Sequence, residues 1–170
     1  KNTALKFREL WAVLPAMELV LLEQVGIRAR KFFDNSEPAA IGVCVRSLRE
    51  INQVHWKAPG SLGDFAWHQD SRFRNPPSAY RNLATAYVQT GLAIDPHTPD
   101  SGCMRIIPRS HLGGDLDMDC SKKALGTAMS DDALEAVGLS EQDAIDLLLE
   151  PGDLALWSPY LVHGSGKNRS

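Results

Sequence analysis

Several features are scarce in this sequence of 170 residues, and each scarcity narrows the class of protein. There are only three cysteines, which cannot all pair, and none stands in a C-x-x-C motif. The sequence therefore gives no basis for a disulfide framework, and we expect a reduced, cytoplasmic setting. No uncharged apolar run approaches the ~20 residues that would span a bilayer. The best candidate, residues 10–22, is shorter and carries Glu18, so no membrane span is expected.

An excess of positive charge is also lacking. The 18 Lys and Arg side chains against 21 Asp and Glu side chains give a formal net charge of −3 at pH 7. This balance provides no general electrostatic attraction for nucleic acid or for an anionic membrane. The composition that is present is ordinary for a globular protein, with 44% hydrophobic and 23% charged residues. The length fits a single domain over residues 1–170.

The order of the predicted elements favours an α+β, mainly β domain. Residues 1–36 form a helical part, because apolar residues recur at helical spacing over 3–33. From residue 40 to 170, short β-branched runs alternate with turn residues, which is typical of a β-sandwich or barrel. Strands are predicted at 41–48, 51–57, 65–70, 82–95, 103–108, 147–150, 153–158 and 161–165. A helix with Ser130 and Ser140 as N-caps is predicted over 130–145, and residues 113–138 are expected to form a flexible lid or specificity insert.

The strongest chemical signal is the H-x-D motif formed by His68 and Asp70. In a strand, side chains two apart point to the same face, so the imidazole and the carboxylate would lie together. Two histidines and one carboxylate on one side of an octahedral ion leave three positions open, which suits non-haem Fe(II). The motif alone is weak, because such a tripeptide is common by chance. Candidates for the missing histidine are His55, His97, His111 and His163.

His163 lies near the end of an apolar predicted strand and is followed by small residues. Ser165 shares its face while the strand continues, so a hydroxyl beside a metal ligand could hold a carboxylate-bearing co-ligand. The alternative interpretation is that His163 ends a buried strand and forms hydrogen bonds only to the backbone. The residues themselves leave both interpretations open.

Three sequence blocks together resemble the phytanoyl-CoA dioxygenase family of Fe(II)- and 2-oxoglutarate-dependent oxygenases. The blocks are Trp67-His68-Gln69-Asp70, the stretch from Asp100 to His111, and the stretch from Pro151-Gly152-Asp153-Leu154 to His163-Gly164-Ser165. They occur in the family's order and cover residues 40–170. The middle block departs from the family pattern, with Asp-Ser in place of Glu-Asn and Arg109 in place of Gly.

The resemblance implies a double-stranded β-helix, a cupin-like jelly-roll with the N-terminal helices packed outside. It implies that His68, Asp70 and His163 are the catalytic residues and bind iron. It further implies that 2-oxoglutarate and O2 are consumed to hydroxylate an unactivated C–H bond of a small-molecule substrate, with release of succinate and CO2. Because Asp70 retains the carboxylate that related halogenases lack, oxidation is favoured over halogenation.

Residues for the co-substrate are less clearly marked. Gln53, His55 and Lys57 alternate along one predicted strand face, and Ser165 follows the second histidine of the motif. Thr85 shares a predicted strand face with Tyr87, Gln89 and Gly91, where the family often has Trp near Gly91, so the absent side chain could enlarge the pocket. We expect Gln53, Lys57, Thr85 and Ser165 to bind 2-oxoglutarate.

The Arg that clamps the distal carboxylate in the family would fall near position 174, beyond Ser170. We do not assign that role to Arg169, and Lys57 is the alternative cation. The missing Arg and the first residue, Lys1, lead us to expect that the domain is incomplete at both ends.

Two other classes of function remain open from the sequence. One is a catalytically silent, cupin-like module that binds a metal or small molecule, and the other is a zinc hydrolase that uses the same three residues. Succinate formation would separate them from an oxygenase. Arg72, Arg74 and Tyr80 follow the H-x-D motif and could hold an acidic substrate, but neither the substrate nor the oligomeric state can be named from the sequence.

Overall fold

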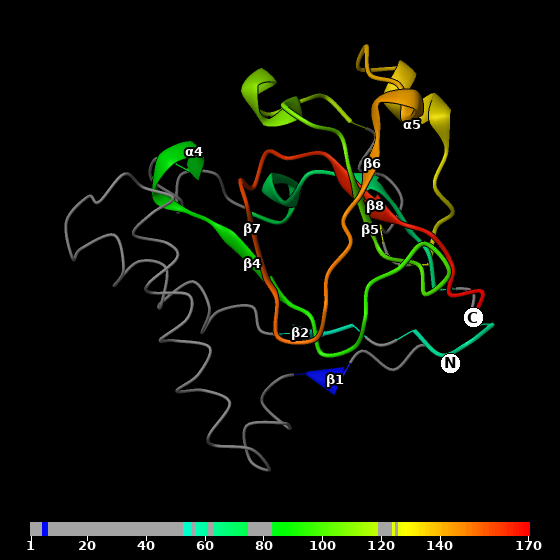
Figure 1. Ribbon diagram of the computed structural model, residues 1–170. Coiled ribbons are helices and arrows are strands. Elements are labelled where there is room, and N and C mark those ends of the chain that lie inside the picture. The colour runs from blue at the N-terminus through cyan, green and yellow to red at the C-terminus, as the bar shows by residue number, and fades with distance from the viewer. Residues whose placement is uncertain are drawn as a thin grey trace.

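The architecture is seen in a computed structural model of the chain (Figure 1). It describes residues 5–6, 53–55, 57–60, 63–74, 83–118, 124 and 126–170. The predicted strand over 41–48 and most of the predicted N-terminal helices lie outside these residues. Within the helical part, Leu5–Lys6 forms strand β1, which pairs antiparallel with β2 (Gln53–Val54). The helical prediction is therefore wrong at these two positions, where cross-strand pairing outweighs the local helical pattern.

Two further antiparallel sheets make up the described part of the domain, which is mainly β as expected. A four-stranded sheet has the order β3-β8-β5-β6, and a two-stranded sheet pairs β4 with β7. Their bounds are β3 Phe65–His68, β4 Gln89–Leu92, β5 Met104–Ile106, β6 Ile145–Asp146, β7 Leu154–Trp157 and β8 His163–Ser165. Figure 1 shows β5, β6 and β8 side by side, with β4 and β7 forming a separate ribbon.

The described helices are short, and none of them is long and apolar enough to cross a membrane. They are η1 Asp70–Phe73, α4 Leu83–Ala86, η3 Ser110–Gly113, α5 Asp131–Glu135 and η4 Glu141–Asp143. The helix predicted over 130–145 is thus two pieces. Gly138, with a φ of 73°, lies between them, a backbone conformation that ends a helix. The Ser140 hydroxyl accepts the N–H of Gln142 as predicted, whereas Ser130 stands at the N-cap of α5 without a side-chain bond.

The long strand predicted over 82–95 is also wrong in its first half. Residues Leu83–Ala86 form α4, and only Gln89–Leu92 pairs as a strand. Leu and Ala favour helix, and a short apolar run does not distinguish helix from strand by periodicity. Similarly, the strand predicted at 147–150 is displaced to Ile145–Asp146, and Leu149 forms only an isolated bridge with His97.

The hydrophobic core packs against one face of the four-stranded sheet. Its buried members are Trp67, Ile107, Met118, Leu134 and Val162. Met118 and Leu134 come from the predicted flexible lid, and Leu134 is fully buried. The segment is therefore anchored to the core at these apolar residues, because burying an apolar side chain is favourable. Since Trp67 packs into this core, the next residue, His68, is directed to the opposite face of β3.

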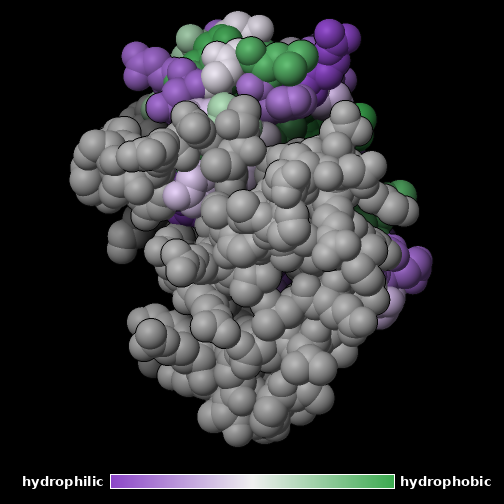
Figure 2. All heavy atoms as spheres, turned by 90° about the vertical axis from the view of Figure 1, so that its left-hand side faces the viewer, coloured by the Kyte–Doolittle hydropathy of each residue, from purple (hydrophilic) through white to green (hydrophobic). Residues whose placement is uncertain are grey.

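The described surface mixes polar and apolar side chains. Figure 2 shows one face of the molecule, where the coloured residues gather mainly at the upper end and hydrophilic and hydrophobic groups lie next to each other. The large exposed apolar residues are distributed over several elements: Phe73, Ile94, Leu112, Ile145 and Leu148. Single exposed apolar residues of this kind are normal for a globular protein.

Candidate metal centre

Three predicted ligands meet at the junction of β3, η1 and β8. One ligand atom from each of His68, Asp70 and His163 lies within 4.8 Å of the others. His68 Nε2 is 3.9 Å from one Asp70 carboxylate oxygen, and His163 Nε2 is 3.6 Å from the other. The two histidines are direct partners in the antiparallel β3–β8 pair, which explains why residues so distant in sequence lie side by side. The prediction that these residues come together is confirmed.

The local conformation around Asp70 differs from the predicted strand. Strand β3 ends at His68, and Asp70 is the first residue of η1. Gln69 between them is still extended, with φ −110° and ψ 143°. The alternation of side chains therefore continues for one more residue, so His68 and Asp70 share a face although the strand has ended.

The backbone fixes both imidazoles in the same way. Nδ1 of His68 lies 2.8 Å from the carbonyl oxygen of Ala66, and Nδ1 of His163 lies 2.9 Å from that of Leu161. A carbonyl only accepts, so each Nδ1 donates its hydrogen, and in the neutral form of such an imidazole Nε2 carries the lone pair. His163 thus does bond to the backbone, as the alternative interpretation held, but this bond directs its other nitrogen toward Asp70. Such an arrangement is the usual support for a metal-binding histidine.

The electrostatics favour the protonation state that binds a cation. Burial, and next the neighbouring His163, lower the pKa of His68 to about 4. Burial alone would raise the pKa of Asp70, but His163, His68 and hydrogen bonds from Gln89 and Trp157 bring it below its usual value. A neutral imidazole and an ionised carboxylate at neutral pH are the forms that coordinate a metal.

Trp157 is a member of this site that the sequence interpretation missed. Its indole Nε1 donates to Oδ2 of Asp70 at 3.0 Å. The ring lies over Gly91 on the neighbouring strand, where an added Cβ would approach it to 3.2 Å. The space beside Gly91 is therefore occupied by the indole and does not enlarge a pocket, contrary to the expectation. An indole within an otherwise apolar strand was the available signal, because a buried indole N–H needs an acceptor.

Lys57 and Ser165 form a second polar group beside the histidines. Lys57 Nζ donates to the Ser165 hydroxyl at 2.6 Å and to the carbonyl oxygens of Gly102 and Gly166 at 2.9 and 2.6 Å. It lies 5.8 Å from the centre of the Phe65 ring, which stacks at 6.4 Å on the ring of His68. Burial lowers the pKa of Lys57 to about 8.

For two of the other predicted site residues, the structure describes the backbone alone. Gln53 belongs to β2 and Thr85 to α4, and the positions of their side chains lie outside what the structure describes. The prediction that Thr85 shares a strand face with Gln89 is wrong, because the chain is helical at Thr85. His55 is exposed and meets the edge of the Phe65 ring at 5.0 Å.

The remaining histidine candidates do not join the metal group. Among the described residues that group consists of His68, Asp70 and His163 alone. His97 lies in a bridge with Leu149, and His111 is exposed in η3. Arg169 is exposed near the end of the chain, and its backbone N–H donates to the carbonyl of Asp100.

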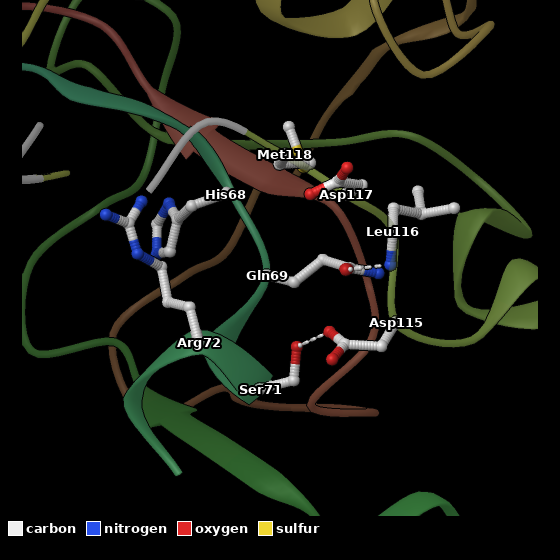
Figure 3. Close-up of a pocket in the computed structure, with 8 residues that line it drawn as sticks. All are labelled: His68, Gln69, Ser71, Arg72, Asp115, Leu116, Asp117 and Met118. Atoms are coloured by element: carbon white, nitrogen blue, oxygen red, sulfur yellow. Dashed lines mark hydrogen bonds between the residues drawn. The ribbon is translucent and has the colours of Figure 1, made fainter. Parts of the chain in front are cut away.

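A pocket of about 400 Å³ opens beside His68 (Figure 3). Arg72 lies next to the imidazole on one side, and residues 115–118 form the opposite wall. Its lining is polar and charged apart from two side chains: His68, Gln69, Ser71, Arg72, Asp115, Leu116, Asp117 and Met118. A concave site with converging polar groups next to a metal group is where a small molecule would bind.

Two curated proteins are similar to this chain in sequence. Dioxygenase lolE1 of Epichloe uncinata is 25% identical over 119 residues, which covers 70% of this chain and 40% of that protein. Methylphosphonate hydroxylase of Gimesia maris (strain ATCC 29201 / DSM 8797 / 534-30) is 26% identical over 124 residues, 69% of this chain and 38% of that protein. The chain thus spans about two fifths of the length of the curated relatives that it matches.

The fold is also found in a solved structure. The crystal structure of EvdO2 from Micromonospora carbonacea var. aurantiaca, complexed with 2-oxoglutarate, matches 99% of this chain and 62% of that chain. The TM-score is 0.62 at 18% sequence identity, so the likeness is one of fold. The sequence model of the phytanoyl-CoA dioxygenase (PhyH) family matches residues 12–170, nearly the whole chain, and includes all three residues of the metal group. This chain belongs to the phytanoyl-CoA dioxygenase family.

Proposed function

We propose that the protein is a non-haem Fe(II)- and 2-oxoglutarate-dependent dioxygenase. It would hydroxylate an unactivated C–H bond of a small molecule and release succinate and CO2. The observation that carries this proposal is the convergence of His68, Asp70 and His163, with ligand atoms within 4.8 Å and both Nε2 atoms turned inward by backbone bonds. Two imidazoles and one carboxylate are the donor set for Fe(II) with open positions. The family and its named dioxygenase and hydroxylase relatives support the same reaction class.

For the scaffold, we infer a single jelly-roll domain of the double-stranded β-helix type over residues 1–170. The antiparallel β3–β8 pair that carries both histidines and the fold likeness to EvdO2 support this. Rigid strands suit a site whose ligands must hold their geometry within a fraction of an ångström. The cytoplasmic location expected from the cysteine content stays a prediction.

Each residue of the metal group has a defined task in this mechanism. His68, Asp70 and His163 would bind Fe(II), which with 2-oxoglutarate and O2 supplies the oxidising chemistry when bound. The indole N–H of Trp157 holds Oδ2 of Asp70 and leaves Oδ1 directed toward His68. This hydrogen bond would hold the carboxylate of Asp70 in a fixed orientation toward the metal.

Lys57 and Ser165 would bind the distal carboxylate of 2-oxoglutarate. Ser165 shares a strand face with His163, and Lys57 provides the charge. All three ammonium hydrogens of Lys57 already have acceptors, so a carboxylate would replace one of them, most simply the rotatable Ser165 hydroxyl. The buried Asn168 side chain donates to the Lys57 carbonyl at 2.8 Å and keeps the lysine in place. Roles for Gln53 and Thr85 in binding the co-substrate stay predictions.

The substrate we propose is a small polar molecule. The pocket beside His68 has a cationic side, from Arg72, and an acidic side, from Asp115 and Asp117. A purely apolar substrate would displace water from these charged groups without offering them a polar contact, which is costly. One of the relatives is named for an anionic substrate, methylphosphonate, which agrees with a polar pocket.

Succinate production tests the proposed function. The protein supplied with Fe(II), O2 and 2-oxoglutarate should release succinate, and Fe(II) should not be replaceable by Zn2+. Metal and 2-oxoglutarate binding without succinate, even with a panel of small polar substrates, would indicate a silent binding module. Ester or amide hydrolysis with Zn2+ would indicate a hydrolase, and both results would overturn the proposal.

A further inference from the structure

Gln69, the central residue of the H-x-D motif, has its entire side-chain amide engaged. Nε2 donates to the carbonyl oxygens of Gly114, at 2.8 Å, and Tyr160, at 2.5 Å. Oε1 accepts the backbone N–H of Leu116 at 2.8 Å. The side chain is 3% exposed. A primary amide has two N–H donors and a carbonyl oxygen, so Gln69 uses both donors and its acceptor.

These bonds join the pocket wall to both strands that carry the histidines. Leu116 is one of the residues 115–118 that line the pocket opposite Arg72 (Figure 3), and Gly114 directly precedes them in the same loop. Tyr160 precedes β8, and Gln69 itself follows directly on β3. One amide therefore connects three segments that meet at the metal group.

Ser71 adds a second, parallel connection. Its hydroxyl donates to Asp115 Oδ1 at 2.7 Å, and its backbone N–H donates to the Pro159 carbonyl at 3.0 Å. The side chains of residues 68–71 alternate in direction. His68 and Asp70 belong to the metal group, whereas Gln69 and Ser71 form hydrogen bonds to the loop (Figure 3). The position of the wall relative to the ligands is thus set by the same four residues that supply two of the ligands.

We propose that Gln69 is a positioning residue, which fixes the 115–118 wall of the substrate pocket at a set distance from the iron ligands. This inference rests on the proposed function, because it takes the pocket as the substrate site. A C–H bond is oxidised only where the wall holds it near the metal, and a displacement of about 1 Å can cost on the order of a hundredfold in rate. Leu116 supports the same wall by packing against the core.

The discriminating substitution is Gln69→Glu. Glu has the same shape and keeps an acceptor for the Leu116 N–H, but it cannot donate to the carbonyls of Gly114 and Tyr160. A buried carboxylate facing two carbonyl oxygens is strongly unfavourable, so the loop should move away. Gln142→Glu is the matched control, because the same change is made at an exposed position of η4.

Hydrogen exchange of the protein loaded anaerobically with Fe(II) and 2-oxoglutarate provides the test. In Gln69→Glu the Leu116 amide should exchange at least about tenfold faster, the effect of losing roughly one hydrogen bond. The Leu139 amide, which donates to Leu134 in the core, should exchange at its wild-type rate. Affinities for Fe(II) and 2-oxoglutarate, read from the visible charge-transfer absorption of their complex, should stay within about twofold of wild type, and Gln142→Glu should change nothing.

Several results would overturn the proposal. These are unchanged Leu116 exchange, equal acceleration at Leu139, which indicates general destabilisation, and loss of Fe(II) affinity in parallel, which indicates an effect on the ligands themselves. If Gln69→Glu does not fold, hydrogen exchange of the wild-type protein provides the test. The Leu116 amide, which is bonded to Gln69, should exchange more slowly than the Asp117 amide in the same loop, and equal rates would overturn the proposal. Absence of succinate from the wild-type protein would overturn the oxygenase assignment but leave these exchange results readable.

Discussion

Two polar groups are centred on strand β8, one around His163 and the other around Ser165. They differ in whether their polar atoms already form hydrogen bonds with one another. Around His163, the inward atoms approach Asp70 at 3.6 and 3.9 Å, which is longer than a hydrogen bond. Around Ser165, the Lys57 ammonium is saturated by three acceptors at 2.6 to 2.9 Å. The first group has donor atoms that converge on a common point, as a cation requires. The second group is complete by itself and can take a ligand only by exchange.

This comparison implies different responses to mutation. Loss of a residue from the group around His163 should abolish metal-dependent chemistry and leave the fold intact, because the inward atoms do not bond to one another. Loss of Lys57 should affect both co-substrate binding and local structure. The predictions below test this difference, beginning with the largest effect.

The largest effect is expected from His163→Ala. Removal of a ligand should lower succinate formation by more than about a hundredfold, beyond the 10–100-fold cost usual for residues that merely support a ligand. Circular dichroism and the melting temperature should stay close to wild type. His111→Ala is the control, because His111 is exposed and lies apart from the metal group. Retained turnover in His163→Ala would remove it from the ligand set.

The second effect is expected from Lys57→Met, which keeps the unbranched side chain as far as Cε and removes the ammonium. The KM for 2-oxoglutarate should rise by about ten- to a hundredfold, since a hydrogen bond to a charged group contributes roughly 1.5–3 kcal/mol. Fe(II) affinity should change little. Lys167→Met, at an exposed position, is the control. An unchanged KM would mean that Lys57 serves only to join Gly102, Ser165 and Gly166.

The third effect concerns the hydrogen bond to Asp70. Trp157→Phe keeps an aromatic ring over Gly91 but removes the indole donor, so Fe(II) affinity should fall by about tenfold, the lower end for a residue that orients a ligand. Trp67→Phe is the matched control. The Trp67 ring packs in the core, and its Nε1 has no hydrogen-bond acceptor among the described residues. Equal Fe(II) affinities in the two variants would contradict a role for Trp157 in holding Asp70.

The smallest effect is a pH dependence. Burial lowers the pKa of Lys57 to about 8, so the ammonium is charged below this value and loses its proton above it. The kcat/KM for 2-oxoglutarate, which reports groups of the free enzyme, should therefore fall by about tenfold at most between pH 7 and pH 9. The fall should be absent in Lys57→Met. A constant kcat/KM over this range in the wild type would show that the Lys57 charge is not used.

Short-range pattern predicted two of the three residues of the metal group, and the third came from the family resemblance. His68 and Asp70 are two apart in an extended segment, and the three-block resemblance identified His163. Lys57 and Ser165 were predicted to bind the same co-substrate, and they are in direct hydrogen-bond contact. What the sequence could not show is the pairing of distant strands. The hydrogen bond from Trp157 to Asp70 forms because β7, in one sheet, lies near the end of β3, in another sheet. The local periodicity of the sequence does not predict which strands of different sheets come close together.

The errors have the same origin in tertiary context. Gly91 was interpreted as an absent side chain and turned out to be space for an indole from the neighbouring strand. Leu83–Ala86 was assigned to a strand, although its residues favour helix. The segment 113–138 was expected to be a flexible lid or a specificity insert, and the burial of Leu134 in the core contradicts a flexible lid at that residue. Gln69 received no role in the sequence analysis, since its three partners lie 45 to 91 residues away and no local pattern indicates them.

The central claim is that His68, Asp70 and His163 hold the Fe(II) that converts 2-oxoglutarate to succinate. The most direct measurement is the amount of succinate formed by the Fe(II)-loaded protein in the presence of O2, with Asp70→Ala measured alongside it. The account predicts repeated turnover in the wild type, and in Asp70→Ala a folded protein that makes no succinate above the level of free Fe(II). Turnover by Asp70→Ala at the wild-type rate, or none by the wild type with iron bound, would contradict it.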